Sequence, residues 1–369
     1  MQVTSRVRGI AQKVMNNALP IRHGEVAVFY AGVEDLDLAY AFAAECEARG
    51  IETIVQSCGD YISHAKLIDA PLEVFERVPK IPKALIDVAD WFVYFTGSAF
   101  DRSIYQKPEF QKRLLEVQKV SKWTFGSSAS ILQLCLAKKT HLVAFLDPYL
   151  QQVEALDMSY EQAKELFLES LDIDYEELSK VGEKVIEAVE KGGEIHVTCP
   201  RGSDLKFRAD GRLWMNEDGK SDPESAPVAK YVHNLPVGEV YVAPLEHSAL
   251  GVVYPQTLPG SALEGLRIEF RGKKKARVSA VKGYESLKPR LDKATGNPYC
   301  IGEFAFGTNP CANVLLATEK AYGTCHFALG QNTWLGGKNA CSIHMDFLIE
   351  KPFVTIDEKP ILKNGKFMI

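Results

Sequence analysis

SIHMDF, residues 342–347, is the stretch that decides the fold of the second half of this chain. Its residues alternate between polar and apolar. Because a β-strand has a period of two, His344 and Asp346 should lie on one face and the apolar residues on the other. The stretch therefore predicts a strand that is buried on one side and carries an imidazole and a carboxylate on the other.

The same alternation recurs at three places upstream. The runs are TCHFAL (324–329), EFAF (303–306) and EVYVA (239–243), and each sets one ionisable side chain opposite apolar neighbours: His326, Glu303 and Glu239. Desolvating several such groups is costly unless they pair or bind a cation. The sequence thus predicts a metal centre that these strands share.

The type of donor narrows the choice of metal. Imidazole and carboxylate donors without a thiolate cluster favour zinc, cobalt, manganese or iron(II), and they disfavour a structural zinc site closed by cysteine. A non-catalytic protein that keeps a metal for structure is therefore the less favoured class. Among the other ionisable residues, Glu319 is expected to be a partner of the ligands or a surface residue, and His247 a loop contact for substrate. His141 and His196 are expected to be hydrogen-bonded structural residues.

Composition sets the outer bounds. The chain has 369 residues, which suits two domains, and 46% of them are hydrophobic. A net charge of −5 and a pI near 6.0 argue against nucleic acid or an anionic membrane as partners. The one basic cluster, residues 273–275, is expected to be a hairpin turn. Eight scattered cysteines without a CxxC pair, and no apolar run of signal or membrane-span length, predict a cytoplasmic protein.

The order of apolar runs predicts the architecture. An apolar run at 26–31, a helical pattern from Asp35 and a β-branched run at 51–55 are typical of a parallel βαβ unit, and runs at 91–95 and 141–146 extend it. Two amphipathic helices, 160–170 and 175–191, end at Gly192-Gly193. We therefore expect an open α/β domain over 1–192 and a mainly β metal-binding domain over 193–369, which is an α/β plus α+β chain. GxGxxG, GxxxxGK[ST], GxSxG and HExxH motifs are absent.

Over roughly residues 230–350 the chain resembles the aminopeptidase T/AmpS family of metallopeptidases. The resemblance is carried by NLPVGEVYVAP (234–244), GEFAFGTNP (302–310), EK (319–320), GTCHFALG (323–330) and SIHMD (342–346). It implies an α/β N-terminal domain, a mainly β active-site domain and a homodimer. It also implies two divalent metal ions, held by Glu239, Glu303, His326, His344 and Asp346.

The expected function is a metal-dependent aminopeptidase, or a hydrolase derived from one, that acts on a peptide or small-molecule substrate. Two metals ~3.5–4 Å apart would polarise the scissile carbonyl and lower the pKa of water toward ~7. Asp346 is expected to bridge them, and Glu303 to be either the remaining ligand or the base. One departure concerns Thr333, which stands where the family has a tyrosine that reaches the metals; Asn332 and Trp334 are the neighbours that could contribute there.

A second family supplies the alternative function. 2,5-Dihydroxypyridine 5,6-dioxygenase is similar to these peptidases, but it uses one iron(II) to activate oxygen. Two histidines and one carboxylate suffice for such a centre, and His326, His344 and Asp346 could supply them. Glu239 and Glu303 favour hydrolysis, because a single iron needs fewer acidic ligands than two metals do.

Overall fold

The computed structural model describes residues 3–57, 60–95, 108–120, 128–146, 153, 155–220, 231–258, 261, 263–312 and 319–369. They pack into two compact units. Unit 1 comprises Met1–Leu168 and Tyr231–Leu235, and unit 2 comprises Glu169–Lys230 and Pro236–Ile369. The sequence-based prediction of an α/β domain over 1–192 and a metal-binding domain over 193–369 stays a prediction. Across the described ranges, no helix is both long and apolar enough to cross a membrane.

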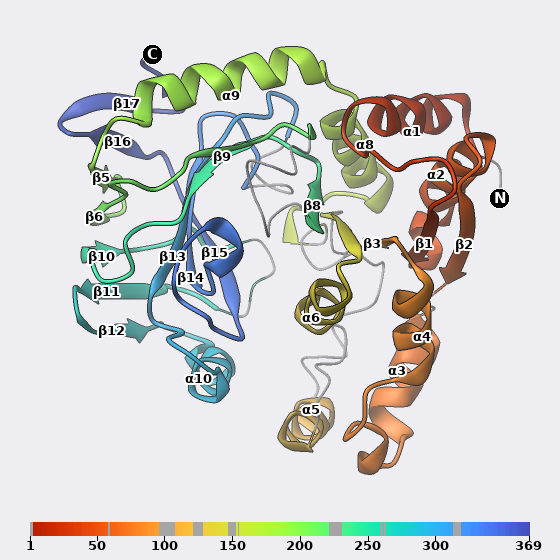
Figure 1. Cartoon of the computed structure of the whole chain (residues 1–369). Helices are drawn as coiled ribbons and strands as arrows, with labels where there is room; N and C mark the ends of the chain where they lie inside the picture. The colour runs from red at the N-terminus through yellow and green to blue at the C-terminus, as the bar shows by residue number, and fades with distance from the viewer. Residues whose placement is uncertain are drawn as a thin grey trace. The chain divides into compact units, whose positions relative to one another are not determined.

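Unit 1 is built on a five-stranded parallel sheet of order β2-β1-β3-β4-β8. Its strands are β1 Val26–Ala31, β2 Glu52–Ser57, β3 Trp91–Phe95, β4 His141–Phe145 and β8 Val232–Leu235 (Figure 1). The four predicted strands are confirmed. Strand β8 was not predicted, because VHNL is short and half polar, and it joins the sheet from far along the chain.

The helices of this first part follow the predicted βαβ pattern. Helix α2 lies between β1 and β2 and buries Leu38, Phe42 and Cys46. Helix α1 begins after Thr4, whose side-chain hydroxyl accepts a hydrogen bond from the Val7 amide at 3.2 Å. The bounds are α1 Ser5–Asn17, α2 Leu36–Ala48, α3 Asp60–Asp69, α4 Lys80–Val88, α5 Pro108–Val120, α6 Ser128–Lys138 and α8 Tyr160–Leu171.

Unit 2 consists of two antiparallel sheets, of orders β12-β11-β10-β6-β5-β16-β17-β18 and β15-β14-β13-β9-β7. The strands of the eight-stranded sheet are β5 Glu194–Thr198, β6 Asp204–Arg208, β10 Leu250–Val253, β11 Arg267–Arg271, β12 Lys274–Ser279, β16 Phe353–Ile356, β17 Lys359–Lys363 and β18 Lys366–Phe367. Those of the five-stranded sheet are β7 Met215–Glu217, β9 Glu239–Val242, β13 Ile301–Gly307, β14 Cys325–Gly330 and β15 His344–Ile349. The predicted mainly β second half is thereby confirmed.

One hydrophobic core joins the two sheets of unit 2. Phe207 of β6 and Phe304 of β13 have ring centroids 5.1 Å apart, and Trp214 packs edge-on to Phe304. Helix α9 (Tyr175–Val189) packs against β7 and β9, and α10 (Tyr284–Lys293) follows β12. The apolar residues of the alternating runs therefore face this core, which leaves the opposite face of the five-stranded sheet for the ionisable ones.

A β-bulge at Gly302 interrupts the regular alternation of side chains between the two faces of β13. Ile301 pairs with Leu329 and Glu303 with Ala328, so two steps on β13 match one step on β14. Ile301 can thus join the core while Glu303 turns to the other face. Only glycine fits here, because a Cβ at residue 302 would lie 2.9 Å from the carbonyl oxygen of Gly330.

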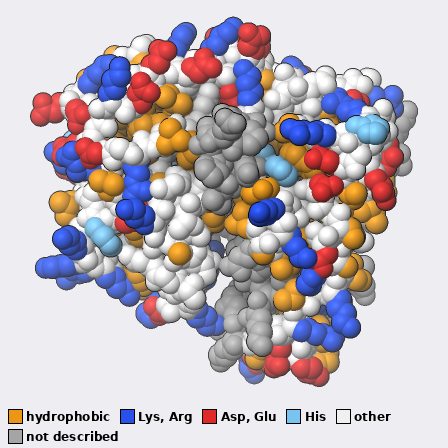
Figure 2. Space-filling view, in the orientation of Figure 1, with side chains coloured by type: hydrophobic (Ala, Val, Ile, Leu, Met, Phe, Trp, Pro, Cys, Tyr) orange, Lys and Arg blue, Asp and Glu red, His pale blue; other side chains and the backbone are white. Residues whose placement is uncertain are grey.

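The face of the molecule drawn in Figure 2 has no large patch of a single type of charge. On the face drawn in Figure 2, acidic and basic side chains are interspersed with scattered hydrophobic ones. The basic residues 273–275 lie at the hairpin between β11 and β12, as predicted, and Gly272 there has a φ of 63°.

Phe304 offers a test of the core. Phe304→Ala should lower the free energy of unfolding by ~3–5 kcal/mol, because it leaves a cavity between the two sheets. Denaturant unfolding followed by circular dichroism measures this. Leu250→Ala, at a side chain that is 57% exposed, should change it by less than ~0.5 kcal/mol; equal losses would place the core elsewhere.

Candidate metal centre

One face of the five-stranded sheet carries all five predicted ligands. Cross-strand pairs set Glu239 opposite Gly307, His326 opposite Ala305, Asp346 opposite Ala328 and His344 opposite Gly330. Each of these four ligands has a glycine or an alanine opposite it on one neighbouring strand, whereas the other neighbour of His326 is Leu348 and that of Glu239 is Glu217. The glycine and alanine positions leave room above the sheet for the ligands to converge.

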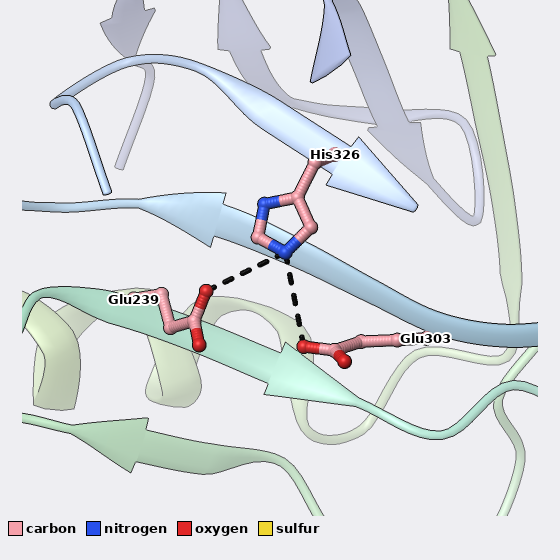
Figure 3. A group of neighbouring side chains, drawn as sticks. All are labelled: Glu239, Glu303 and His326. Atoms are coloured by element: carbon pink, nitrogen blue, oxygen red, sulfur yellow. Dashed lines mark ion pairs between the residues drawn. The ribbon is translucent and has the colours of Figure 1, made fainter. Parts of the chain in front are cut away.

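Three of these ligands form a first group. The Nε2 atom of His326 lies 3.5 Å from Oε2 of Glu239 and 3.8 Å from Oε1 of Glu303, and all three residues are buried (Figure 3). Oε2 of Glu239 and Nδ1 of His326 find no hydrogen-bond partner among the described residues. Buried polar atoms left in this way are the condition that a bound cation relieves.

The second group shares Glu303 with the first. His344 Nε2 lies 2.9 Å from Glu303 Oε2 and 3.3 Å from Asp346 Oδ1. His344 Nδ1 lies 2.7 Å from the carbonyl oxygen of Gln331. A backbone carbonyl at this nitrogen holds the proton there and directs the Nε2 lone pair at the ligand group. One oxygen of Glu303 thus faces each histidine.

The pKa values reflect this crowding of unlike groups. Burial disfavours the charged form of His326, but its hydrogen bond with Glu303 and the charge of Glu239 outweigh burial and raise its pKa to about 9. Burial also disfavours the charged form of His344, but the charges of Asp346 and Glu303 and the hydrogen bonds with them outweigh burial. They raise the pKa of His344 well above its ordinary value. Hydrogen bonds from both histidines hold the pKa of Glu303 below its usual range despite burial. Without a cation, the two histidines carry the compensating positive charge.

Lys320 is a further member of the site that the sequence did not reveal. Its side chain is 1% exposed, and Nζ lies 2.5 Å from Oε1 of Glu239, 2.6 Å from Oε2 of Glu217 and 3.4 Å from Oε1 of Glu319. Burial disfavours its charge, yet these carboxylates raise the pKa of Lys320 well above its ordinary value. Lys320 therefore fixes one oxygen of Glu239 and leaves the other directed at His326. The sequence feature that could have pointed to Lys320 is its position directly after Glu319 in the EK motif (319–320).

The donor set fits divalent metal ions. In each group the candidate ligand atoms lie within 4.8 Å of one another, so they could close on an ion with small rotamer changes. Oxygen and imidazole nitrogen are donors that suit zinc, cobalt, manganese and iron(II). The unpartnered Glu239 oxygen adds an acceptor that a cation would satisfy.

Other predicted residues take different places. Glu319 belongs to neither group and is a neighbour of Lys320, which agrees with its expected role as a partner. His247 is exposed in the turn after β9, and His196 pairs with Asp204 at 2.8 Å on β5. His141 lies 3.1 Å from His233 and stacks on Trp91 in unit 1.

The segment after His326 replaces the missing tyrosine with other contacts. Thr333 opens a short 3-10 helix, η5 (Thr333–Leu335), and the ring of Trp334 lies 5.1 Å from that of His344. Buried Asn332 donates to Glu246 at 3.2 Å, so it holds the loop. A phenol is present elsewhere on the same face: Tyr241 is paired in register with Ala305, and burial raises its pKa well above the ordinary value.

The predicted strand at 342–347 is shifted in the structure. Strand β15 begins at His344 and runs to Ile349, so Ser342 lies outside it. The Ser342 hydroxyl accepts a hydrogen bond from the Thr295 amide at 2.9 Å, which draws this residue away from the sheet. His344 and Asp346 still lie on one face, as predicted.

A mainly β unit whose sheet face gathers histidines and carboxylates around a shared glutamate has the donor set of a metalloenzyme. The chain belongs to the thermophilic metalloprotease (M29) family, which matches residues 173–367, more than half of its length. The family resemblance predicted from the sequence is thereby confirmed.

Three known proteins are similar to this chain in sequence or in fold. It is 28% identical over 182 residues to aminopeptidase 2 of Geobacillus stearothermophilus, a match that spans 42% of this chain and 42% of that protein. Wild-type AmpT from Thermus thermophilus is similar over 99% of both chains, with a TM-score of 0.74 and 21% identity. 2,5-Dihydroxypyridine dioxygenase from Pseudomonas putida KT2440 is similar over 100% of this chain and 98% of its own, with a TM-score of 0.60 and 13% identity. The two structural similarities show a shared fold.

Metal binding should release protons. A protonated imidazole cannot bind a metal, so the affinity for Zn²⁺ should rise from pH 6.5 to 9, by up to ~tenfold per pH unit for each displaced proton. The stability of the metal-free protein should change in the opposite sense: the His326 contribution is complete below pH ~6.5 and is lost as the pH rises through about 9. Calorimetric titration in buffers of different ionisation enthalpy measures the release. Zn²⁺ binding at pH 7.5 without proton release would contradict these assignments.

Lys320 should matter more to stability than an exposed lysine with a similar pair. Lys320→Met leaves buried carboxylates uncompensated and should lower the free energy of unfolding of the metal-free protein by ~3 kcal/mol. The matched control is Lys282→Met, which removes an exposed pair with Glu264 and should cost less than ~1 kcal/mol. Denaturant unfolding compares them, and an equal cost would show that Lys320 is not the compensating cation.

Proposed function

We propose that this chain is a metal-dependent aminopeptidase that removes N-terminal residues from peptides. The observation that carries the proposal is the pair of ligand groups that meet at Glu303 on one sheet face. Membership of the M29 family and the match to aminopeptidase 2 support the same reaction class. In this proposal Glu239 and His326 hold one divalent ion, His344 and Asp346 hold the other, and Glu303 is the ligand that both share rather than the base.

The charge of the site supports two ions. Five carboxylates gather around Lys320 and the histidines: Glu217, Glu239, Glu303, Glu319 and Asp346. When all five are ionised, they and the Lys320 ammonium group leave four negative charges, which two divalent cations would balance and one would not. Burial raises the pKa of Glu239 and of Glu319, so nearby cations are what would keep these two carboxylates ionised. A buried excess of negative charge is costly, so the acid-rich surroundings favour the second ion.

The roles of the chain's own residues follow from their contacts. Divalent ions, when bound, supply Lewis acidity that polarises a carbonyl group and lowers the pKa of water. Gln331 holds the proton of His344 on Nδ1, so Nε2 is free to bind. Lys320 keeps Glu239 from swinging away, because it occupies Oε1 while Oε2 faces His326. The small residues beside the ligands leave space for the scissile bond above the sheet.

The second candidate is an iron(II) ring-cleaving dioxygenase, and the fold shared with 2,5-dihydroxypyridine dioxygenase favours it. His326 and His344 with one carboxylate would suffice for a mononuclear centre. The distinction lies in Glu239, because a single iron held by His326, His344 and Asp346 does not need this residue. Lys320 and Glu239 would then form a purely structural pair.

Glu239→Gln separates the two functions. For the peptidase it should lower bound metal from two ions per chain to one and reduce the hydrolysis of aminoacyl p-nitroanilides by more than ~100-fold. Removing oxygen should leave the wild-type rate unchanged. Metal analysis and anaerobic assays measure these quantities, with Glu264→Gln, at an exposed surface pair, as the matched control.

The opposite pattern would promote the dioxygenase. One iron per chain that is retained in Glu239→Gln, together with oxygen-dependent ring opening of a dihydroxypyridine, would overturn the peptidase proposal. Hydrolysis without oxygen by protein that holds two ions would overturn the dioxygenase.

A further inference from the structure

A cavity of about 310 Å³ opens beside the metal centre within unit 2. Its lining includes three ionisable residues, Glu319, His326 and Asp346, and the polar residues Gln256, Thr257 and Ser261. The rest of the lining, called the apolar wall below, consists of Leu258, Leu263, Leu266, Phe347 and Leu348. The volume is at the small end of the range for ligand sites, about 300–1,000 Å³, so it suits one side chain rather than a long peptide.

The sheet edge explains why the apolar wall lies against the ligands. Strand β15 is the edge of its sheet, and the amide of Gln256 donates a hydrogen bond to the carbonyl oxygen of Leu348 at 2.8 Å. The segment 256–258 therefore runs along this edge. Leu348 is paired in register with His326, so the first apolar group of the wall is next to a ligand on the same face.

Glu319 lines the cavity and belongs to neither ligand group. It pairs with Lys320, whose Nζ is 3.4 Å from Oε1 of Glu319 but only 2.5 Å from Glu239 and 2.6 Å from Glu217. Lys320 is thus engaged mainly by the other two carboxylates. Glu319 keeps 24% of its side chain exposed and lines the cavity, where a carboxylate can accept charge-assisted hydrogen bonds from an incoming cation.

We propose that this cavity binds the N-terminal residue of the substrate: the leucines take an apolar side chain, and Glu319 accepts hydrogen bonds from the α-ammonium group. This inference rests on the proposed aminopeptidase function and names its substrate class, peptides with a leucine-sized apolar N-terminal residue. The ammonium group at Glu319 and the side chain against Leu263 would leave the following carbonyl group over the ligands. An acetylated N-terminus, which carries no charge, would lose its partner in the site.

The wall is tested by specificity. Wild-type protein loaded with metal should cleave leucine p-nitroanilide with a kcat/KM at least ~10-fold above that of alanine p-nitroanilide, because the cavity buries the additional carbons. Leu263→Asp should lower the ratio of leucine to lysine p-nitroanilide cleavage by ~100-fold, since the new carboxylate favours a cationic side chain. Leu263 is only partly buried, so the variant should fold. Leu250→Asp, at an exposed leucine of the other sheet, is the matched control and should keep the wild-type ratio.

The ammonium contact is tested by binding, independently of turnover. By calorimetry, L-leucinol should bind the metal-loaded protein at least ~10-fold more tightly than 4-methylpentan-1-ol, which lacks the amine. Glu319→Gln should remove most of this difference and leave the metal content unchanged.

Each outcome decides a separate point. Loss of a metal ion in Glu319→Gln would make this residue a ligand and overturn the proposed contact, as would an unchanged affinity for L-leucinol. An unchanged leucine-to-lysine ratio in Leu263→Asp would overturn the side-chain pocket. If no aminoacyl p-nitroanilide is cleaved by wild-type protein, the aminopeptidase function itself fails, and the substrate assignment fails with it, whereas selective binding of L-leucinol would still identify an amine site.

Discussion

The cost of burying like charges together is the constraint on which unit 2 depends. Glu239 and Glu303 are each at most 7% exposed at the side chain, and they lie on the same sheet face as Asp346. Cations stabilise such a cluster, and burial raises the pKa of Glu239 where they do not suffice. Among the described residues, Lys320 is a permanent cation beside it, and the two histidines are cations that depend on protonation. Metal ions would take over from the histidines, whose imidazoles then become ligands. The same carboxylates that destabilise the empty arrangement are what would make it a strong binding site.

The candidate ligands could be predicted from the sequence because a strand has a fixed period. His344 and Asp346, two residues apart, had to share a face, and the apolar residues that alternate with them, Ile343, Met345 and Phe347, identified which face was the core. Lys320 could not be found in this way, because its partners Glu217 and Glu239 come from other strands and the contact depends on their register. The sharing of Glu303 between two groups is also a matter of register, and the bridging role that the sequence suggested for Asp346 stays a prediction.

The fold was predictable for a similar reason, and its exceptions are long-range. Strands β1, β3 and β4 of unit 1 have continuous apolar runs, which are typical of strands covered on both faces, and β2 at the sheet edge has a shorter one. Strand β8 has no such run and takes its place only through pairing with β4. The cavity beside the centre was equally hidden, because the leucines around residue 260 have no periodic pattern and approach His326 only through the edge of β15. Patterns within one segment were informative, and contacts between distant segments were not.

The bulge at Gly302 makes the size of one residue part of the chemistry of β13. If this residue carried a larger side chain and the bulge were lost, ordinary alternation would place Ile301 and Glu303 on the same face, so either Ile301 would leave the core or Glu303 would enter it. Substitutions at neighbouring strand positions change only one side chain, but a substitution here would turn a ligand away from its partners. In a lineage of related chains, a larger residue at position 302 should therefore mark the loss of the metal centre even where all five ligand residues are still present in the sequence.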